Sequence, residues 1–176
     1  DLLFSWGAII KKYNKNEVVY TEDEDAHFYY QIVEGNVKMF TSNDVGKELT
    51  LGVYSDGQSF GEPPLFANKP YPAKSITTTQ SIIVKLSKDK FFKIIDEYPK
   101  IERSFLCLLA NKMLMKTKKS IDNINQKPEF RIIAFLNNCK LESNGNGKKM
   151  LIPYTRQEIA NFTGLRVETV IREMTK

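Results

Sequence analysis

Residues 155–172, which read TRQEIANFTGLRVETVIR, decide the fold of the C-terminal part of the chain. Thr155 is followed three residues later by Glu158, and this capping-box pattern predicts that a helix begins at Thr155. We expect the helix to end at Gly164, because glycine readily takes the left-handed conformation of a tight turn. Three of its side chains should be buried: Ile159, Ala160 and Phe162.

A second helix should open at Leu165 and turn Val170 toward the first helix. Two short helices joined by a turn that contains glycine, with an alanine where the helices approach closely, form the helix-turn-helix pattern. This arrangement leaves four side chains of the second helix pointing outward: Val167, Glu168, Ile171 and Arg172.

The outward-facing residues have side chains suited to hydrogen bonding with DNA bases. Arginine can donate two hydrogen bonds to O6 and N7 of guanine, and glutamate can accept one from N4 of cytosine. Arg172 and Glu168 are therefore candidates for reading G·C pairs in the major groove of double-stranded DNA. The alternative is an i, i+4 ion pair between them, which would stabilise the helix by only a few tenths of a kcal/mol. Both can hold, because such a pair would orient the two side chains.

The charge of the chain is unevenly distributed around a net value of +5. Residues 1–96 carry 11 basic and 13 acidic side chains, whereas residues 97–176 carry 15 basic and 8 acidic ones, including all the arginines. Neutralising phosphates releases their counterions, which drives sequence-independent binding to nucleic acids. The C-terminal part is thus a candidate partner of a polyanion, with a solvated basic face as the alternative.

Short strands separated by turns are expected over residues 13–86. The apolar and β-branched runs lie at residues 17–20, 28–33, 37–40, 50–54 and 75–86. We expect 28–33 and 37–40 to pair as a hairpin across Gly35. Many short strands with few helical signals predict a sandwich, barrel or roll.

Helical periodicity begins after residue 88. A short helix at 90–98 should be ended by Pro99, and a long one should follow at 101–125. The long helix is apolar on nearly every face, so it must be covered on all sides. The predicted roll can cover one side, and we expect the same helix of a second chain to cover the other in a two-fold homodimer. Alternatively, residues missing from the C-terminal end of the sequence cover that side of the helix.

The rest of the chain continues the helical pattern. Pro128 should break the long helix and mark a hinge, and a further helix is expected at 129–141, followed by a turn at 143–147 and a short strand at 150–152.

The composition favours a cytoplasmic protein without a membrane segment. No stretch approaches the roughly 20 apolar residues that a membrane span requires, and residues 1–4 are too few for a signal peptide. Cys107 and Cys139 have apolar neighbours and no CxxC spacing, which predicts two buried free thiols, with a disulfide as the alternative.

The sequence lacks the residues that a catalytic metal site or a cofactor site would need. His27 is the only histidine, whereas a metal-dependent dioxygenase built on a β-roll needs several imidazole or carboxylate ligands. Two cysteines are too few for an iron–sulfur cluster, and haem held by His27 or a cysteine is an alternative that nothing in the sequence supports. We expect no catalytic residues, metal or cofactor.

Residues 155–160 and 164–172 resemble the recognition unit of the Crp/Fnr family of bacterial transcription regulators, and the resemblance extends over essentially the whole chain. It implies an α+β fold with an antiparallel β-roll of the cyclic-nucleotide-binding jelly-roll kind (1–98), a long dimerisation helix and hinge (99–127), and a winged helix-turn-helix domain (128–176). A β-hairpin wing follows the recognition helix in that family, so we expect the sequence to be truncated before the wing.

The resemblance also implies site residues. In the family, the residues matching Glu168 and Arg172 contact bases, and Val167 and Ile171 stand beside them. Val167 replaces the Arg of the Crp branch, and Ile171 replaces the Ser of the Fnr branch. Four residues would lie near the DNA backbone: Thr155, Arg156, Gln157 and Thr169.

Residues 60–66, FGEPPLF, resemble the phosphate-binding cassette of cyclic-nucleotide-binding domains. The Arg-Ser pair that grips the cyclic phosphate in that family is replaced by Pro72 and Ala73, and residues 1–96 contain no other arginine, so the bidentate clamp is absent. Glu62 is either a structural remnant that bonds loop amides or a ligand contact. Pro63, Pro64 and Pro72 remove backbone donors. A possible effector pocket consists of Gly61, Glu62, Ala73 and Thr117.

Together these features predict a sequence-specific DNA-binding regulator that acts as a homodimer on an inverted repeat and is not controlled by cAMP. Its partners would be double-stranded DNA, a second copy of the chain, RNA polymerase, which the resemblance implies, and an unknown small-molecule effector. The alternative is a β-roll module that senses a nucleotide or other small molecule and retains only weak or vestigial DNA binding.

Overall fold

The structure is a computed structural model that describes residues 2–43, 46, 48–125, 127–142, 152 and 154–175, with only the backbone described at 119–125, 138 and 140–142. The chain divides into two compact units, Asp1–Ala110 and Asn111–Lys176. Each unit is described by itself below, and the helix α4 (Pro99–Asn125) contributes residues to both.

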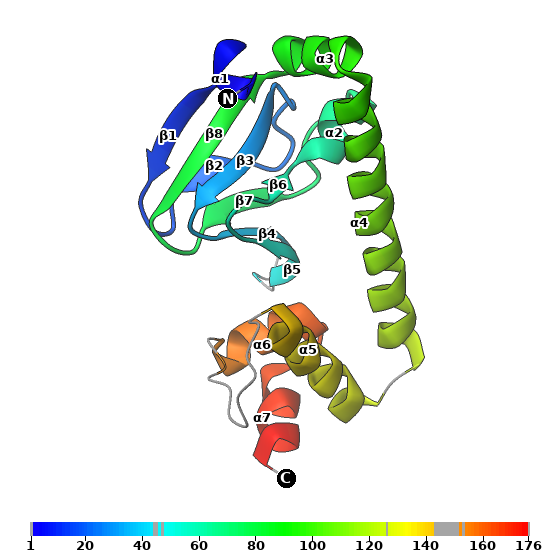
Figure 1. The fold of residues 1–176 in the computed structure, drawn as a ribbon. Helices are drawn as coiled ribbons and strands as arrows, with labels where there is room; N and C mark the ends of the chain where they lie inside the picture. The colour runs from blue at the N-terminus through cyan, green and yellow to red at the C-terminus, as the bar shows by residue number, and fades with distance from the viewer. Residues whose placement is uncertain are drawn as a thin grey trace. The chain divides into compact units, whose positions relative to one another are not determined.

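Two four-stranded antiparallel sheets form the body of the first unit within the described residues (Figure 1). The strands are β1 (Ile9–Tyr13), β2 (Val18–Tyr20), β3 (Phe28–Glu34), β4 (Val37–Ser42), β5 (Glu48–Tyr54), β6 (Ser59–Phe60), β7 (Lys74–Thr77) and β8 (Ser81–Ser87). One sheet has the order β1-β8-β3-β6 and the other has the order β2-β7-β4-β5. Consecutive strands lie in different sheets except for β4 and β5, which pair with each other, as in a jelly roll. The predicted β-roll is therefore confirmed.

The predicted hairpin between residues 28–33 and 37–40 is wrong. β3 pairs with β6 and β8, whereas β4 pairs with β5 and β7, so the chain crosses from one sheet to the other at Gly35. Gly35 has φ 98°, and its N–H donates a hydrogen bond of 2.8 Å to the Asp56 carboxylate on another loop. Long-range contacts of this kind fix the crossing, and the local turn pattern cannot distinguish a crossing from a hairpin.

Besides the two sheets and the start of α4, the described part of the first unit contains three helices: α1 (Leu2–Ser5), α2 (Glu62–Ala67) and α3 (Lys88–Glu97). The helix α2 was not expected, because its segment is rich in glycine and proline. Pro63 and Pro64 lie in its first turn, where an N–H would have no intrahelical partner and its loss disrupts nothing. The helix α3 begins two residues before the predicted Lys90, and α4 begins at Pro99 itself.

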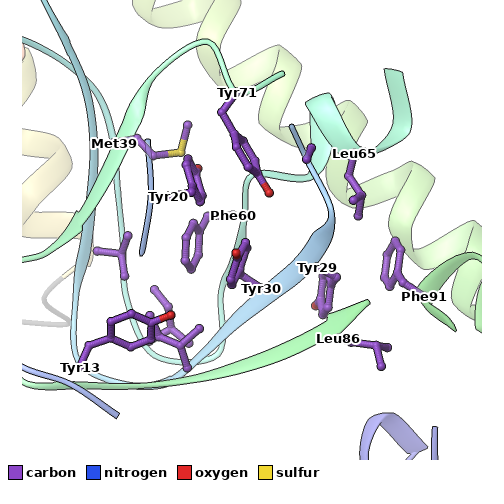
Figure 2. Close-up of a cluster of buried hydrophobic side chains, with 14 of the residues drawn as sticks. Tyr13, Tyr20, Tyr29, Tyr30, Met39, Phe60, Leu65, Tyr71, Leu86 and Phe91 are labelled. Atoms are coloured by element: carbon purple, nitrogen blue, oxygen red, sulfur yellow. The ribbon is translucent and has the colours of Figure 1, made fainter. Parts of the chain in front are cut away.

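Aromatic side chains dominate the core of the first unit (Figure 2). The rings of Tyr20 and Tyr71 stack with centroids 3.7 Å apart, and those of Tyr29 and Phe91 stack at 4.5 Å. Such pairs add about 0.5–1.5 kcal/mol each beyond the area that they bury. The second pair joins β3 to α3, so the sheet and the helix share one core.

The second unit contains the C-terminal part of α4 and the helices α5 (Pro128–Glu142), α6 (Arg156–Thr163) and α7 (Val167–Thr175). The helix predicted at 129–141 is confirmed as α5, and it begins at Pro128. The second helix of the motif begins at Val167 rather than at Leu165, because Leu165 belongs to the turn and packs against the core. The predicted turn at 143–147 lies outside the described residues, as does most of the strand predicted at 150–152; Ile152 is described and is in no strand.

Neither Cys107 nor Cys139 forms a disulfide within the described residues, but the predicted burial of Cys107 is wrong. Ile101 and Phe105 of α4 pack against the core of the first unit, whereas Cys107 is exposed and Cys139 is half-buried. A single roll covers only one side of an apolar helix, which leaves Cys107 uncovered in one chain. Among the described helices, none is long and apolar enough to cross a membrane.

Candidate functional site

The start of α6 has the predicted capping box. The Glu158 N–H donates to Thr155 Oγ1 at 3.2 Å, and the Thr155 N–H donates to the Glu158 carboxylate at 2.7 Å. The Thr155 hydroxyl also donates to the same carboxylate at 2.9 Å. These bonds satisfy two N–H groups that would otherwise lack partners at the helix start. Glu158 is thus structural, and the Thr155 side chain is engaged within the box.

The turn between α6 and α7 is built on Gly164. Its φ of 66° lies in the left-handed region, and its N–H donates to the Ala160 carbonyl, as predicted for a helix end. Ile159, Ala160 and Val170 are at most 1% exposed, so α7 packs closely on α6. The predicted contact of Val170 with the first helix is confirmed. Phe162, expected to be buried, is half-buried between Phe135 and Tyr154.

The outer side of α7 presents Glu168, Ile171 and Arg172 to solvent. Ile171 is 49% exposed, so its apolar side chain is accessible beside the two charged residues. Val167 differs from the expectation, because it is half-buried and packs against the core of the second unit. The exposed set is therefore two charged side chains with one apolar side chain beside them.

The i, i+4 ion pair between Glu168 and Arg172 is not formed among the described residues. Arg172 Nε instead lies 3.1 Å from the carboxylate of the adjacent Glu173, and the Arg172 side chain is 67% exposed. The Glu173 side chain is only 7% exposed, so this contact joins an exposed guanidinium group to a carboxylate that lies largely out of solvent.

The four expected backbone contacts lie on both helices of the motif. Arg156 and Gln157 are exposed in the first turn of α6, and Gln157 Nε2 donates to Asn161 Oδ1 at 3.0 Å. Thr169 is half-buried in α7, and Thr155 is exposed at the cap of α6. The first turn of α6 thus combines a cation with the positive end of the helix dipole.

Sequence reasoning missed Arg131 of α5. Its Nη2 donates a hydrogen bond to the Thr163 carbonyl at the end of α6. The available signal was an arginine inside an apolar helix, since a half-buried guanidinium group needs a partner.

The expected effector pocket divides between the two units. Gly61, Glu62 and Ala73 lie in the first unit and are buried; Glu62 is 2% exposed and Ala73 is 0% exposed. Thr117 lies in the second unit, where its hydroxyl donates to the Met113 carbonyl at 3.0 Å.

Aromatic rings lie directly against the backbone of the cassette. A Cβ on Gly61, whose φ is 77°, would be 3.2 Å from the Tyr20 hydroxyl and 3.3 Å from the Tyr71 ring. The Tyr71 ring stacks on Tyr20 and is 1% exposed (Figure 2). Gly61, a residue of the expected effector pocket, is therefore closely approached by two tyrosine side chains of the chain itself.

Buried phenols surround this region. Burial, with the Glu62 carboxylate as the lesser cause, raises the pKa of Tyr54 to about 12 and that of Tyr29 well above its usual range. Burial and then Glu17 raise the pKa of Tyr13 to about 12. No cluster of three or more His, Cys, Asp or Glu residues in the described part of the chain could hold a metal ion, and His27 is exposed.

Comparisons with known proteins agree with this architecture. The family model of the cyclic nucleotide-binding domain matches residues 10–98. The chain is 30% identical over 169 residues to the cAMP-activated global transcriptional regulator CRP of Haemophilus influenzae, and the match covers 93% of this chain and 74% of that protein. The chain belongs to the Crp/Fnr family of transcription regulators.

Other Crp/Fnr relatives match over similar lengths. An anaerobic regulatory protein of Aggregatibacter actinomycetemcomitans is 21% identical over 92% of this chain and 64% of its own length. The c-di-GMP-responsive regulator CLP of Xanthomonas campestris has the same fold, with a TM-score of 0.86, 21% identity, and coverage of 99% of this chain and 88% of that chain. FixK2 of Bradyrhizobium japonicum follows at 0.80 and 21%, covering 96% and 83% of the two chains. This Crp/Fnr protein is accordingly a transcription regulator.

Proposed function

We propose that this Crp/Fnr-family regulator binds double-stranded DNA sequence-specifically, as a homodimer on an inverted repeat, and is not controlled by cAMP. The observation that carries the proposal is the pair α6–α7, which combines a complete capping box and a left-handed glycine turn with exposed Glu168 and Arg172. A helix-turn-helix inserts its second helix into the major groove.

Three exposed side chains of α7 would read base pairs. Arg172, whose side chain is 67% exposed, would donate two hydrogen bonds to a guanine, and Glu168 would accept from a cytosine amine. Ile171, which is 49% exposed, offers an apolar contact for a thymine methyl group. Val167 would contribute less, because it is half-buried.

The first turn of α6 would bind the DNA backbone. Arg156 and Gln157 are exposed there, beside the N–H groups and the positive dipole at the start of the helix. Thr155 and Thr169 would add contacts to the DNA backbone. Contacts to phosphate fix the register of the protein on DNA and carry no direct sequence information.

The homodimer would form through one face of α4. Leu106, Met113 and Leu114 are between 60% and 71% exposed. Leu106 and Met113 are seven residues apart and lie on the same face of the helix, as do Cys107 and Leu114. A second copy related by a two-fold axis would cover this apolar face and would double the number of recognition helices.

The lack of cAMP control rests on the first unit. The arginine that would pair with a cyclic phosphate is absent, and the rings of Tyr20 and Tyr71 lie against Gly61. Burying a phosphate without a paired cation is costly. In this proposal residues 1–98 form a sensing roll for an unidentified effector, 99–127 the dimerisation helix and hinge, and 128–176 the DNA-binding domain. The protein would act in the cytoplasm with RNA polymerase and without catalytic activity.

A nucleotide-sensing module with weak or vestigial DNA binding is the second candidate. The match of residues 10–98 to the cyclic nucleotide-binding domain favours it. The state of the two sites counts against it, because the phosphate clamp is missing, whereas the helix-turn-helix retains its cap, turn and exposed charged residues.

Selection of binding sites from random DNA tests the proposal. Two recognition helices about 34 Å apart should enrich an inverted repeat whose half-site centres are about 10 base pairs apart. The enrichment should be the same with and without cAMP. If no preferred sequence were recovered, the second candidate would be favoured. Enrichment only in the presence of cAMP would contradict the proposal that DNA binding does not depend on cAMP.

A further inference from the structure

Arg131 on α5 contacts the turn that joins α6 to α7. Its Nη2 donates a hydrogen bond to the carbonyl of Thr163, the last residue of α6. The same nitrogen lies 3.1 Å from the position that a Cβ on Gly164 would occupy. The guanidinium group therefore lies against the residue at which the chain reverses between the two helices.

The contact matches the chemistry of a helix end. The last carbonyls of a helix lack intrahelical partners and carry partial negative charge, so a cation beside them is favourable. Thr163 is only 4% exposed, which leaves little access for water to replace Arg131 as a partner. Arg131 Nε is also buried and has no hydrogen-bond partner among the residues that the structure describes. The guanidinium group is thus held inside the unit rather than extended into solvent.

The backbone beside Arg131 is anchored in the core. Ile132 is 4% exposed and packs in the same cluster as Ile159 of α6 and Val170 of α7. The side chain of Arg131 consequently reaches the turn from a fixed position on a third helix, which couples α5 to the angle between α6 and α7.

We propose that Arg131 is a positioning residue for DNA reading: it fixes the α6–α7 turn so that α7 presents Glu168 and Arg172 in one orientation. The inference rests on the proposed function. A recognition site tolerates displacements of only about 0.5 Å or 10–20°. A turn without this contact would allow α7 to tilt, and hydrogen bonds to base edges would be lost while contacts to phosphate, which tolerate more variation, would persist.

The test compares Arg131→Gln with Lys127→Gln in the intact protein. Lys127 is exposed just before α5, so its replacement removes the same charge without touching the turn. Each protein is titrated with the DNA site that the wild type selects and with random DNA. The titrations are made at several salt concentrations, below the unfolding temperature of each protein. We expect the ratio of the two affinities to fall roughly tenfold or more in Arg131→Gln and to stay at the wild-type value in Lys127→Gln. Affinity for random DNA and the salt slope should be the same in both variants.

Two further variants separate the contact from the removal of a charge. Arg131→Lys should recover most of the ratio, because an ammonium group can donate to the same carbonyl. Gly164→Ala disturbs the contact from the other side and should lower the ratio without a change in charge.

Three outcomes would overturn the inference: a folded Arg131→Gln protein that keeps the wild-type ratio, equal losses on both DNAs, or an unchanged ratio in Gly164→Ala. A wild-type protein without any sequence preference would instead contradict the proposed function, and the inference would fall with it.

Discussion

The charged residues of the helix-turn-helix differ in the geometry that their proposed contacts with DNA require. Glu168 and Arg172 need a fixed direction, because hydrogen bonds to base edges depend on angle, whereas Arg156 needs only proximity to a phosphate. All three side chains are exposed. Their different roles therefore predict different responses to substitution.

Arg156→Ala should weaken binding to all DNA sequences about equally. The arginine neutralises about one phosphate, so its loss should flatten the dependence of log affinity on log salt by roughly one unit. Titration of selected and random DNA at several salt concentrations measures both quantities. Lys93→Ala removes an exposed cation from α3 and should leave the slope unchanged. A change in base preference in Arg156→Ala would contradict its assignment to the backbone.

Buried tyrosines make the first unit sensitive to alkali. An unfolded phenol titrates at about 10, whereas burial and Glu17 raise the pKa of Tyr13 to about 12. Between these values the folded state binds more protons than the unfolded state. The contribution of the buried phenol to the free energy of unfolding is therefore fully present below pH 10 and is lost as the pH rises toward 12. Each such group should contribute a slope of about 1.4 kcal/mol per pH unit.

Denaturant unfolding from pH 8 to 11, followed by phenolate absorbance and circular dichroism, measures this slope. Tyr13→Phe removes one titrating group and should make the slope shallower by up to that amount. A free energy of unfolding that stays constant to pH 11 would show that the phenols are not protected.

Whole elements differ in how far the sequence could predict them. The capping box of Thr155 and Glu158 and the turn at Gly164 could be predicted because each depends on neighbours within a few residues. The partners of β3 and β4 could not, since strand pairing depends on distant contacts such as that of Gly35 with Asp56. The helix α2 was missed because proline marks both turns and helix starts.

Candidate site residues follow the same division. The exposure of Glu168 and Arg172 followed from helical spacing, whereas the half-buried state of Val167 depends on where α7 begins. The contact of Tyr20 and Tyr71 with Gly61 joins three segments of the chain and left no local signal.

Charge on the apolar face of α4 should prevent dimerisation. Met113 is 71% exposed, whereas Leu109 is half-buried, so Met113 is the better position to test the interface. Met113→Glu would bring two carboxylates together in an apolar interface, which should yield monomer in sedimentation experiments. Gln80→Glu introduces the same charge at an exposed position outside α4 and should remain dimeric. An unchanged dimer in Met113→Glu would place the interface elsewhere.

The whole molecule combines a nucleotide-binding fold with a cassette whose clamp is missing. The family match over residues 10–98 describes the roll, and the absent arginine describes its chemistry. We therefore expect no micromolar binding of cyclic AMP or cyclic GMP in titration calorimetry, because the phosphate would lose its hydration without gaining a cation. Micromolar binding that is lost in Glu62→Ala would contradict this expectation and restore Glu62 as a ligand contact.

Base preference in variants of α7 tests the central claim most directly. The preference is measured at every position of the selected site for the wild type, Glu168→Ala and Arg172→Ala. Each substitution should cost about 1–3 kcal/mol on the preferred site and relax the preference at one base pair, with little change on random DNA. If both variants kept the wild-type base preference and lost only thermal stability, α7 would not be the reading helix.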